Sequence, residues 1–124
     1  MIYPTLELAV AFNEALRQPD EWFEEPDELD RVERAINSVV GELDVVRAVG
    51  LLMARLVRTQ GFTEGNKRTA FALGAWTLEQ NGLSAKFMLQ ASDTSILDLL
   101  LKAARGADVA EELVELLCVR AKDL

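Results

Sequence analysis

Residues 60–69 bring together the side chains that an anion site needs. Glu64 is a hard oxygen ligand that could hold Mg²⁺, and Gly65 lets the backbone turn sharply and approach a ligand. The amide of Asn66 can donate a hydrogen bond to a phosphate oxygen, and Lys67 and Arg68 follow directly. Cations at the start of a helix oppose the helix dipole unless an anion is present. The segment therefore predicts a phosphate and metal site.

The plainer alternative is a charged loop between two helices, in which Glu64 only complements the helix dipole. That reading does not require an acid, a glycine, an amide and two adjacent cations together. Phe62 has no polar group and is predicted to anchor the loop in the core. The first position is Gln60, where a general base would be useful and an amide stands instead.

Length and composition predict one soluble domain spanning residues 1–124. Half of the residues are hydrophobic and 27% are charged, which is typical of a globular protein. No apolar run approaches the length of a membrane span, and the start lacks the pattern of a signal peptide. The single cysteine, Cys118, is predicted to be a buried thiol and fits a cytoplasmic location. We expect no membrane partner.

The formal net charge is −8, which argues against nucleic-acid binding. The charges are unevenly placed, however. Residues 45–92 hold six cations and two carboxylates, whereas residues 20–33 hold eight carboxylates and one arginine. A locally positive centre in an acidic chain favours a small anionic ligand, unless these cations only balance neighbours on a solvated face. The acidic surface also predicts a protein partner of basic character.

Apolar residues recur with helical spacing almost everywhere, and no strand pattern of useful length is visible. The sequence predicts an all-α bundle of about six helices, in which two central helices are buried because they are apolar nearly all round. The predicted helices cover residues 6–18, 28–40, 44–59, 66–80, 93–106 and 108 to near the C-terminus. The first is expected to bury a stripe of Leu6, Ala9, Val10, Phe12 and Leu16, and the second to bury Leu29. Ser92 or Asp93 is the predicted cap of the fifth helix, and Asp108 with Glu111 resembles a capping box at the start of the sixth. Residues 19–27 are predicted to form a loop, and residues 83–91 to be extended or irregular.

This layout places residues 60–65 between the two most buried helices. A rigid scaffold beneath a loop is the usual setting for binding and catalytic residues. The backbone N–H groups at the start of the helix from residue 66 would lack helical partners and so favour an anion.

Residues 62–69, Phe-Thr-Glu-Gly-Asn-Lys-Arg-Thr, resemble the signature loop of the Fic/Doc family, His-x-Phe-x-Asp/Glu-Gly/Ala-Asn-Lys/Gly-Arg. The choice of Lys67 and Thr69 is more similar to the Doc (death-on-curing) branch than to the Fic adenylyltransferases. The chain length, the Tyr-Pro near the N-terminus and the Gln-Asn-Gly at residues 80–82 also fit that branch. The resemblance thus covers nearly the whole chain.

The resemblance implies an all-α protein that binds ATP with Mg²⁺ and transfers AMP, or in Doc a phosphate, to a hydroxyl of a target protein. For Doc the target is elongation factor Tu, and a small antitoxin restrains the toxin. Carried onto this sequence, Glu64 takes the place of the metal ligand, and residues 65–68 (Gly65, Asn66, Lys67 and Arg68) take the phosphate contacts. Trp22 and Phe23 lie where the family has a flap that docks the target, although they could equally close the core.

The sequence departs from the pattern at its first position, where Gln60 replaces the family histidine that accepts a proton from the target hydroxyl. An amide cannot act as a general base, and losing such a base typically costs ~10²–10⁴-fold in rate. No other histidine is present. Glu64 could in principle act as the general base, but it could not then hold the metal as well. The chain could be a silenced natural member, an inactivated form of a toxic enzyme, or a weak transferase in which Gln60 only orients the acceptor.

Overall fold

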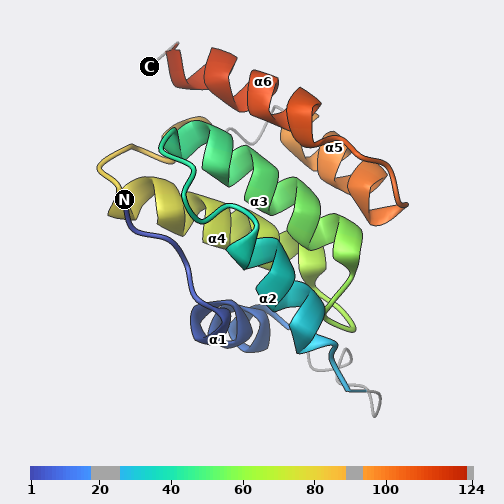
Figure 1. Ribbon diagram of the computed structural model, residues 1–124. Coiled ribbons are helices and arrows are strands. Elements are labelled where there is room, and N and C mark those ends of the chain that lie inside the picture. Colours follow the sequence, from blue (N-terminus) through green and yellow to red (C-terminus); the bar gives the residue numbers. More distant parts are fainter. Residues whose placement is uncertain (18–25, 89–93, 123–124) are drawn as a thin grey trace.

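The structure is a computed structural model that describes residues 1–17, 26–88 and 94–122. Within these ranges the fold is all-α, as predicted, with no strand. The elements are α1 (Leu6–Leu16), α2 (Leu29–Asn37), α3 (Val45–Thr59), α4 (Asn66–Gln80), the 3₁₀ turn η2 (Lys86–Met88), α5 (Ser95–Ala104) and α6 (Ala110–Lys122). They form three layers, with α3 and α4 between the α1–α2 pair and the α5–α6 pair (Figure 1).

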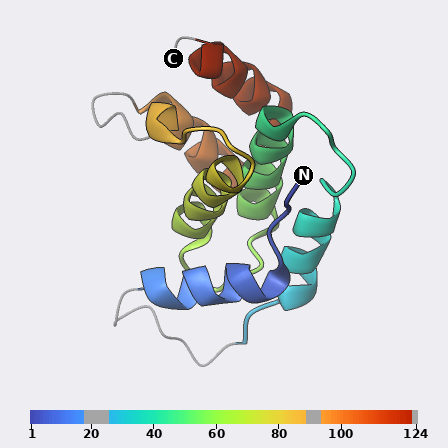
Figure 2. The same cartoon turned by 90° about the vertical axis from the view of Figure 1, so that its left-hand side faces the viewer.

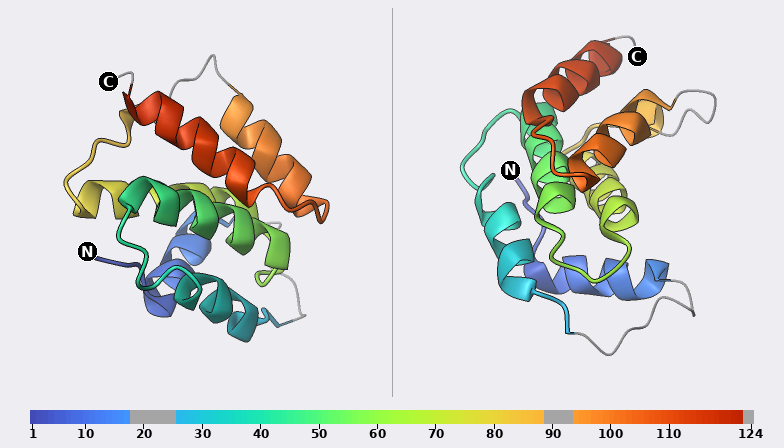
Figure 3. Two further views of the ribbon diagram at one scale, coloured as in Figure 1. Left: turned by 45° about the horizontal axis from the view of Figure 1, so that its top comes forward. Right: turned by 90° about the vertical axis from the view of Figure 1, so that its right-hand side faces the viewer.

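Helix α3 is the centre of the bundle because it contacts α2, α4, α5 and α6. Both views of Figure 3 show it enclosed on several sides. Nine of its residues are buried: Ala48, Val49, Gly50, Leu51, Leu52, Met53, Ala54, Leu56 and Val57. Burying each large aliphatic side chain contributes about 1.5–3 kcal/mol, so α3 is a rigid support for the loop that follows it. The prediction of a buried central pair is confirmed, and α4 contacts α1, α3 and α5.

Helix α1 crosses the end of the central pair at which the chain passes from α3 to α4 (Figure 2). Its N-cap is Thr5, whose hydroxyl accepts a hydrogen bond from the backbone N–H of Leu8. Two residues of α1 are buried, Ala9 and Asn13. The apolar stripe predicted for this helix is therefore only partly buried, and a polar residue lies on its most enclosed side.

The bounds of α3 and α4 agree with the sequence, since local signals mark their ends. Asp44 caps α3 by accepting a hydrogen bond from the N–H of Arg47. Gly65, with φ of 80°, precedes α4, and Gly82, with φ of 82°, follows it. The N–H groups of Gly82 and Leu83 return to the carbonyls of Glu79 and Leu78, which is the Schellman arrangement of a helix C-terminus.

Several other boundaries were predicted wrongly. Helix α2 ends at Asn37, and a turn occupies the three residues that the prediction added. Leu29, predicted to be buried, is 37% exposed. Thr94, and not Ser92 or Asp93, is the N-cap residue of α5. Residues 86–88 form a 3₁₀ turn where irregular chain was predicted.

The predicted capping box at the start of α6 is also absent. The Asp108 carboxylate accepts a hydrogen bond from the N–H of Ala110, and the helix begins at that residue. Glu111 instead pairs with Arg47 of α3 through two hydrogen bonds of 3.0 and 3.2 Å. Cys118, predicted to be buried, is half-buried. None of the helices in the described part of the chain combines the length and apolar character needed to cross a membrane.

Candidate functional site

The loop between α3 and α4 begins at Gln60, which has an unusual backbone. Its φ and ψ are 51° and 43°, and it is the one non-glycine residue with positive φ in the described ranges. The Gln60 backbone N–H and side-chain Nε2 both donate to the carbonyl of Val57, at 3.3 and 2.8 Å. The side chain of this exposed residue thus caps the C-terminus of α3.

Asn66, the first residue of α4, holds the loop in shape. Its side chain is almost fully buried, accepts a hydrogen bond from the Phe62 N–H at 3.1 Å and donates to the Phe62 carbonyl at 2.8 Å. It also donates a long hydrogen bond to Gln60 Oε1 at 3.4 Å. Because both ends of the amide already have partners within the loop, the contacts of Asn66 are those of a loop-positioning residue. A direct contact with phosphate stays a prediction.

Two neighbouring residues fix the loop to the core. Phe62 is 2% exposed and belongs to the main hydrophobic cluster. The Gly61 carbonyl accepts a hydrogen bond from the N–H of Glu28 at 2.7 Å. A Cβ at Gly61 would lie 2.6 Å from Cγ2 of Val32, so only glycine fits beside α2 at this point.

A buried polar network joins the loop to α1. Asn13 is 2% exposed, and its Nδ2 donates to the Glu64 carbonyl at 2.9 Å and to Thr69 Oγ1 at 3.1 Å. Its Oδ1 accepts a hydrogen bond from Arg17 Nη2 at 2.6 Å. The Asn13 Nδ2 group therefore joins α1 to the chain on both sides of Gly65, while Oδ1 holds the side chain of Arg17.

The network continues from α1 to the chain that precedes α2. Arg17, whose side chain is 5% exposed, forms an ion pair with Asp27 at 3.1 Å. Asp27 Oδ1 also accepts a hydrogen bond from the Thr63 N–H at 2.7 Å. The Arg17 guanidinium holds the Asp27 carboxylate in place, and Asp27 in turn holds the loop. Residues 13, 17 and 27 were missed by the sequence reasoning. The one available signal was a polar Asn13 on the predicted buried stripe of α1.

The charged residues at the start of α4 differ in what they already contact. Glu64 is half-buried, and within the described residues its Oε1 accepts only a long hydrogen bond, 3.3 Å, from the Gly65 N–H. Lys67 is exposed and has neither an ion pair nor a hydrogen bond within the described chain. Arg68 is half-buried and its Nη1 donates to the carbonyl of Leu16 in α1 at 3.0 Å. Lys67 is thus the more accessible of the two cations, and the backbone N–H groups of the first turn lack partners within the helix.

The donor set fits Mg²⁺ bound together with a phosphate, and does not fit a metal held by protein alone. Among the described residues, no three His, Cys, Asp or Glu side chains come together as a metal cluster. Mg²⁺ typically binds one or two carboxylates plus substrate phosphates, so Glu64 alone is compatible. Thr63 Oγ1 is buried without a hydrogen-bond partner in the described part of the chain. Such an atom costs free energy unless water or a ligand satisfies it.

Trp22 and Phe23, the residues predicted to form a target flap, lie outside the described residues. The remaining predicted site residues, from Gln60 to Arg68, come together in one loop and one helix turn over α1. These features define an all-α protein whose two central helices are joined by a loop that carries the residue types of an anion site.

One comparison with known proteins identifies a family. The model of the Fic/DOC family matches residues 6–78, which is more than half of the chain and includes the whole loop. The chain belongs to the Fic/Doc family. No curated protein and no solved structure matches it. The match ends within α4, so η2, α5 and α6 lie outside the matched region.

Proposed function

We propose that the chain is a Doc-like transferase scaffold that binds ATP with Mg²⁺ at residues 60–69 and turns it over poorly or not at all. The observation that carries this proposal is the loop itself. It lies at the N-terminus of a central helix and is held there by buried polar contacts, with Lys67 and Glu64 accessible beside it. Family membership supports ATP-dependent transfer of a phosphate or nucleotide as the class of reaction.

Residues 64–68 would divide the binding of the metal and the nucleotide between them. Glu64 would hold Mg²⁺, while Lys67, Arg68 and the backbone N–H groups from Gly65 onward would bind the phosphates. When bound, the nucleotide supplies the group to be transferred and the metal offsets its charge. Asn66 would act on the nucleotide mainly by keeping the loop in its binding conformation.

Gln60 limits the chemistry because it has no group that accepts a proton near neutral pH. In a transfer, the acceptor oxygen bonds to phosphorus, the donor P–O bond breaks and the hydroxyl proton must leave. The side-chain amide of Gln60 is directed to the Val57 carbonyl, where it stabilises the helix end. The oxygen of the same amide, Oε1, could still accept a hydrogen bond from a hydroxyl and orient it.

The target and the partner follow only from the resemblance to Doc. We propose a hydroxyl of a translation factor such as elongation factor Tu as the acceptor, and a small antitoxin as the regulator. Incubation of the Gln60→His variant with cell extract and ATP tests the reaction. Label on the γ-phosphate detects phosphate transfer, and label on the α-phosphate detects AMP transfer. We expect the variant to label a protein that the unchanged chain labels weakly or not at all. If the variant leaves every protein unlabelled, the enzymatic proposal is wrong.

A second candidate is a nucleotide- or protein-binding module without turnover, which Gln60 favours. Calorimetry with ATP and Mg²⁺ tests it directly. Lys67→Ala should weaken binding, whereas Lys86→Ala, an equally exposed lysine on η2, should not. If neither ATP nor a candidate antitoxin peptide binds the unchanged chain, the binding-module proposal fails.

A further inference from the structure

A hollow of about 450 Å³ lies between α2 and α3, and none of residues 60–69 lines it. Three of its six lining residues are arginines and none is acidic. The lining residues are Arg31, Arg34, Ala35, Ser38, Arg55 and Thr59. We call this feature the arginine hollow. It brings together cations from two helices in a chain whose net charge is −8.

Arg55 is the cation that α3 contributes to the arginine hollow, and it is incompletely neutralised. The other two outward arginines of α3 have carboxylate partners in or near α6, since Arg47 pairs with Glu111 at 3.0 Å and Arg58 lies 3.9 Å from Asp108. Arg55 forms no ion pair within the described chain, although Glu111 acts on it at longer range. Its Nη1 donates to the carbonyl and hydroxyl oxygens of Ser38, at 3.3 and 3.1 Å.

The two arginines of α2 are paired but solvent-accessible. Arg31 pairs with Glu28 at 2.6 Å, and its side chain is 47% exposed. Arg34 pairs with Asp30 at 3.0 Å, and its side chain is 75% exposed. Exposed pairs of this kind contribute little to stability, so exchanging their carboxylates for those of a partner costs little. The arginine hollow therefore offers up to three guanidinium groups to an incoming anion.

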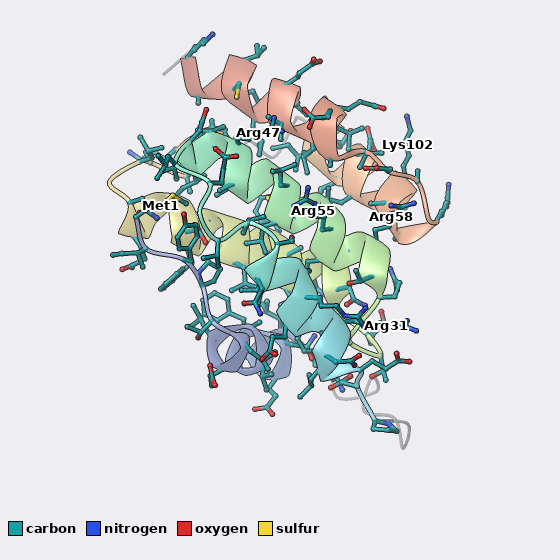
Figure 4. The ribbon with its side chains drawn as sticks, in the orientation of Figure 1. Met1, Arg31, Arg47, Arg55, Arg58 and Lys102 are labelled. Carbon is teal, nitrogen blue, oxygen red and sulfur yellow. The ribbon has the colours of Figure 1, made fainter. Side chains whose placement is uncertain are left out.

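The arginine hollow lies directly beside the loop between α3 and α4, residues 60–65, which we call the motif loop. Its Thr59 precedes Gln60 in the chain, and Arg31 Nη1 donates to the Thr59 carbonyl at 3.4 Å. Figure 4 shows Arg31 and Arg55 on one face of the molecule, with Arg31 at the end of α2 that lies next to the loop. A molecule bound here would lie next to Gln60, which is exposed.

We propose that the arginine hollow binds an acidic segment of a partner protein, with Arg55 as its central contact. The hollow is open and far larger than one carboxylate or phosphate, which fits several side chains of a peptide better than a single small ion. Arginine forks match carboxylates in geometry as well as charge. A long polyanion such as a nucleic acid would also meet the acidic remainder of the surface, which disfavours it. The acidic partner proposed here differs from the basic partner predicted from the net charge. The net charge does not show that three arginines lie together in one hollow.

The test uses the full chain and a short fluorescein-labelled oligoglutamate peptide, followed by fluorescence anisotropy. We expect saturable binding at physiological ionic strength, stronger at low salt, and none for an oligoglutamine peptide of equal length. The Arg55→Gln variant should raise the Kd about tenfold or more, since a charge-assisted hydrogen bond is lost. The matched control is Lys102→Gln, which removes one exposed cation from α5 and should change the Kd little.

Arg34→Gln provides a second variant that is safe for folding, because that side chain is mostly exposed. It should also weaken binding of the oligoglutamate peptide, but by a smaller factor than Arg55→Gln. The proposal is overturned if the unchanged chain does not bind oligoglutamate, or if Lys102→Gln weakens binding as much as Arg55→Gln. Tighter binding of an RNA oligonucleotide of equal charge would overturn the assignment to a protein segment. None of these measurements uses ATP, so they stand or fall independently of the proposed transfer reaction.

Discussion

Replacing Asn13 with alanine should loosen the motif loop and destabilise the protein. The side chain donates to the Glu64 carbonyl and to Thr69 Oγ1, and accepts from Arg17. Two neutral hydrogen bonds contribute about 1 kcal/mol each, and one to a charged group about 1.5–3 kcal/mol. Their sum is about 4 kcal/mol. Water entering the vacated space would restore part of this, so we expect a loss of about 2–4 kcal/mol.

Urea unfolding followed by circular dichroism measures this loss as a lower midpoint at unchanged slope. The matched control is Asn37→Ala, which removes the same side chain from an exposed position at the end of α2 and should cost no more than about 0.5 kcal/mol.

Hydrogen exchange should locate the effect of Asn13→Ala. Amides of residues 60–69 should exchange faster, while those of α5 and α6, which lie in the layer beyond the central pair, should change little below the global unfolding limit. Equal stability of the Asn13 and Asn37 variants would refute the reasoning that this network holds the loop. Faster exchange spread evenly over all helices would contradict its local action.

Three further predictions concern the loop and one surface ion pair. Gly65→Ala should lower the free energy of unfolding by about 1–2 kcal/mol because φ is 80°. The loss should exceed that of Gly82→Ala, where φ is also positive but the space around the residue is open. Equal thermal midpoints of the two variants would argue against crowding at Gly65. Gln60→Gly should be more stable than Gln60→Ala by about 1 kcal/mol in urea unfolding, because both lack the amide and only alanine resists positive φ. The hydrogen bonds and charge of Arg47 lower the pKa of Glu111 from its ordinary value of 4.5. The stability that this carboxylate contributes is therefore present above pH 4.5, and it is lost as the pH falls through the lowered pKa of the folded state. Glu111→Gln should therefore lose less thermal stability than the unchanged chain on acidification from about pH 5 to pH 3, and parallel curves would contradict the pairing.

The sequence predicted those elements whose causes are local. The bounds of α4 follow from Gly65 and Gly82, because each supplies the positive φ that a helix boundary of this kind requires. The end of α2 was placed too late because the apolar Val39 continues the helical spacing of the sequence. In the structure Val39 is buried, but it lies in the turn that follows the helix. Leu29 was placed in the core although it lies at the first turn of α2, where the helix is still exposed.

The chemistry-bearing residues of the loop were visible for the same reason, since Glu64 to Arg68 are consecutive. The residues that position them were not, because they are far apart in the chain. Asn13 is 51 residues from Glu64 and 56 from Thr69. Asp27 is 36 residues from Thr63. No periodicity or composition connects such positions, and only the crossing of α1 beneath the loop brings them together. The arginine hollow is concealed similarly, because its cations come from two helices.

The contacts of Gln60 bear on whether binding and turnover can be separated in this protein. The loop is held by Asn66 at its end and by Asn13 beneath it. Among the described residues, the Gln60 side chain bonds only to the Val57 carbonyl and, weakly, to Asn66. A change at residue 60 therefore alters the group next to an acceptor hydroxyl while leaving the network under the phosphate-binding turn in place. On this reasoning Gln60→His should change turnover far more than ATP affinity, whereas Asn13→Ala should change both. If Gln60→His instead weakened ATP binding as strongly as Asn13→Ala, residue 60 would belong to the binding half of the loop.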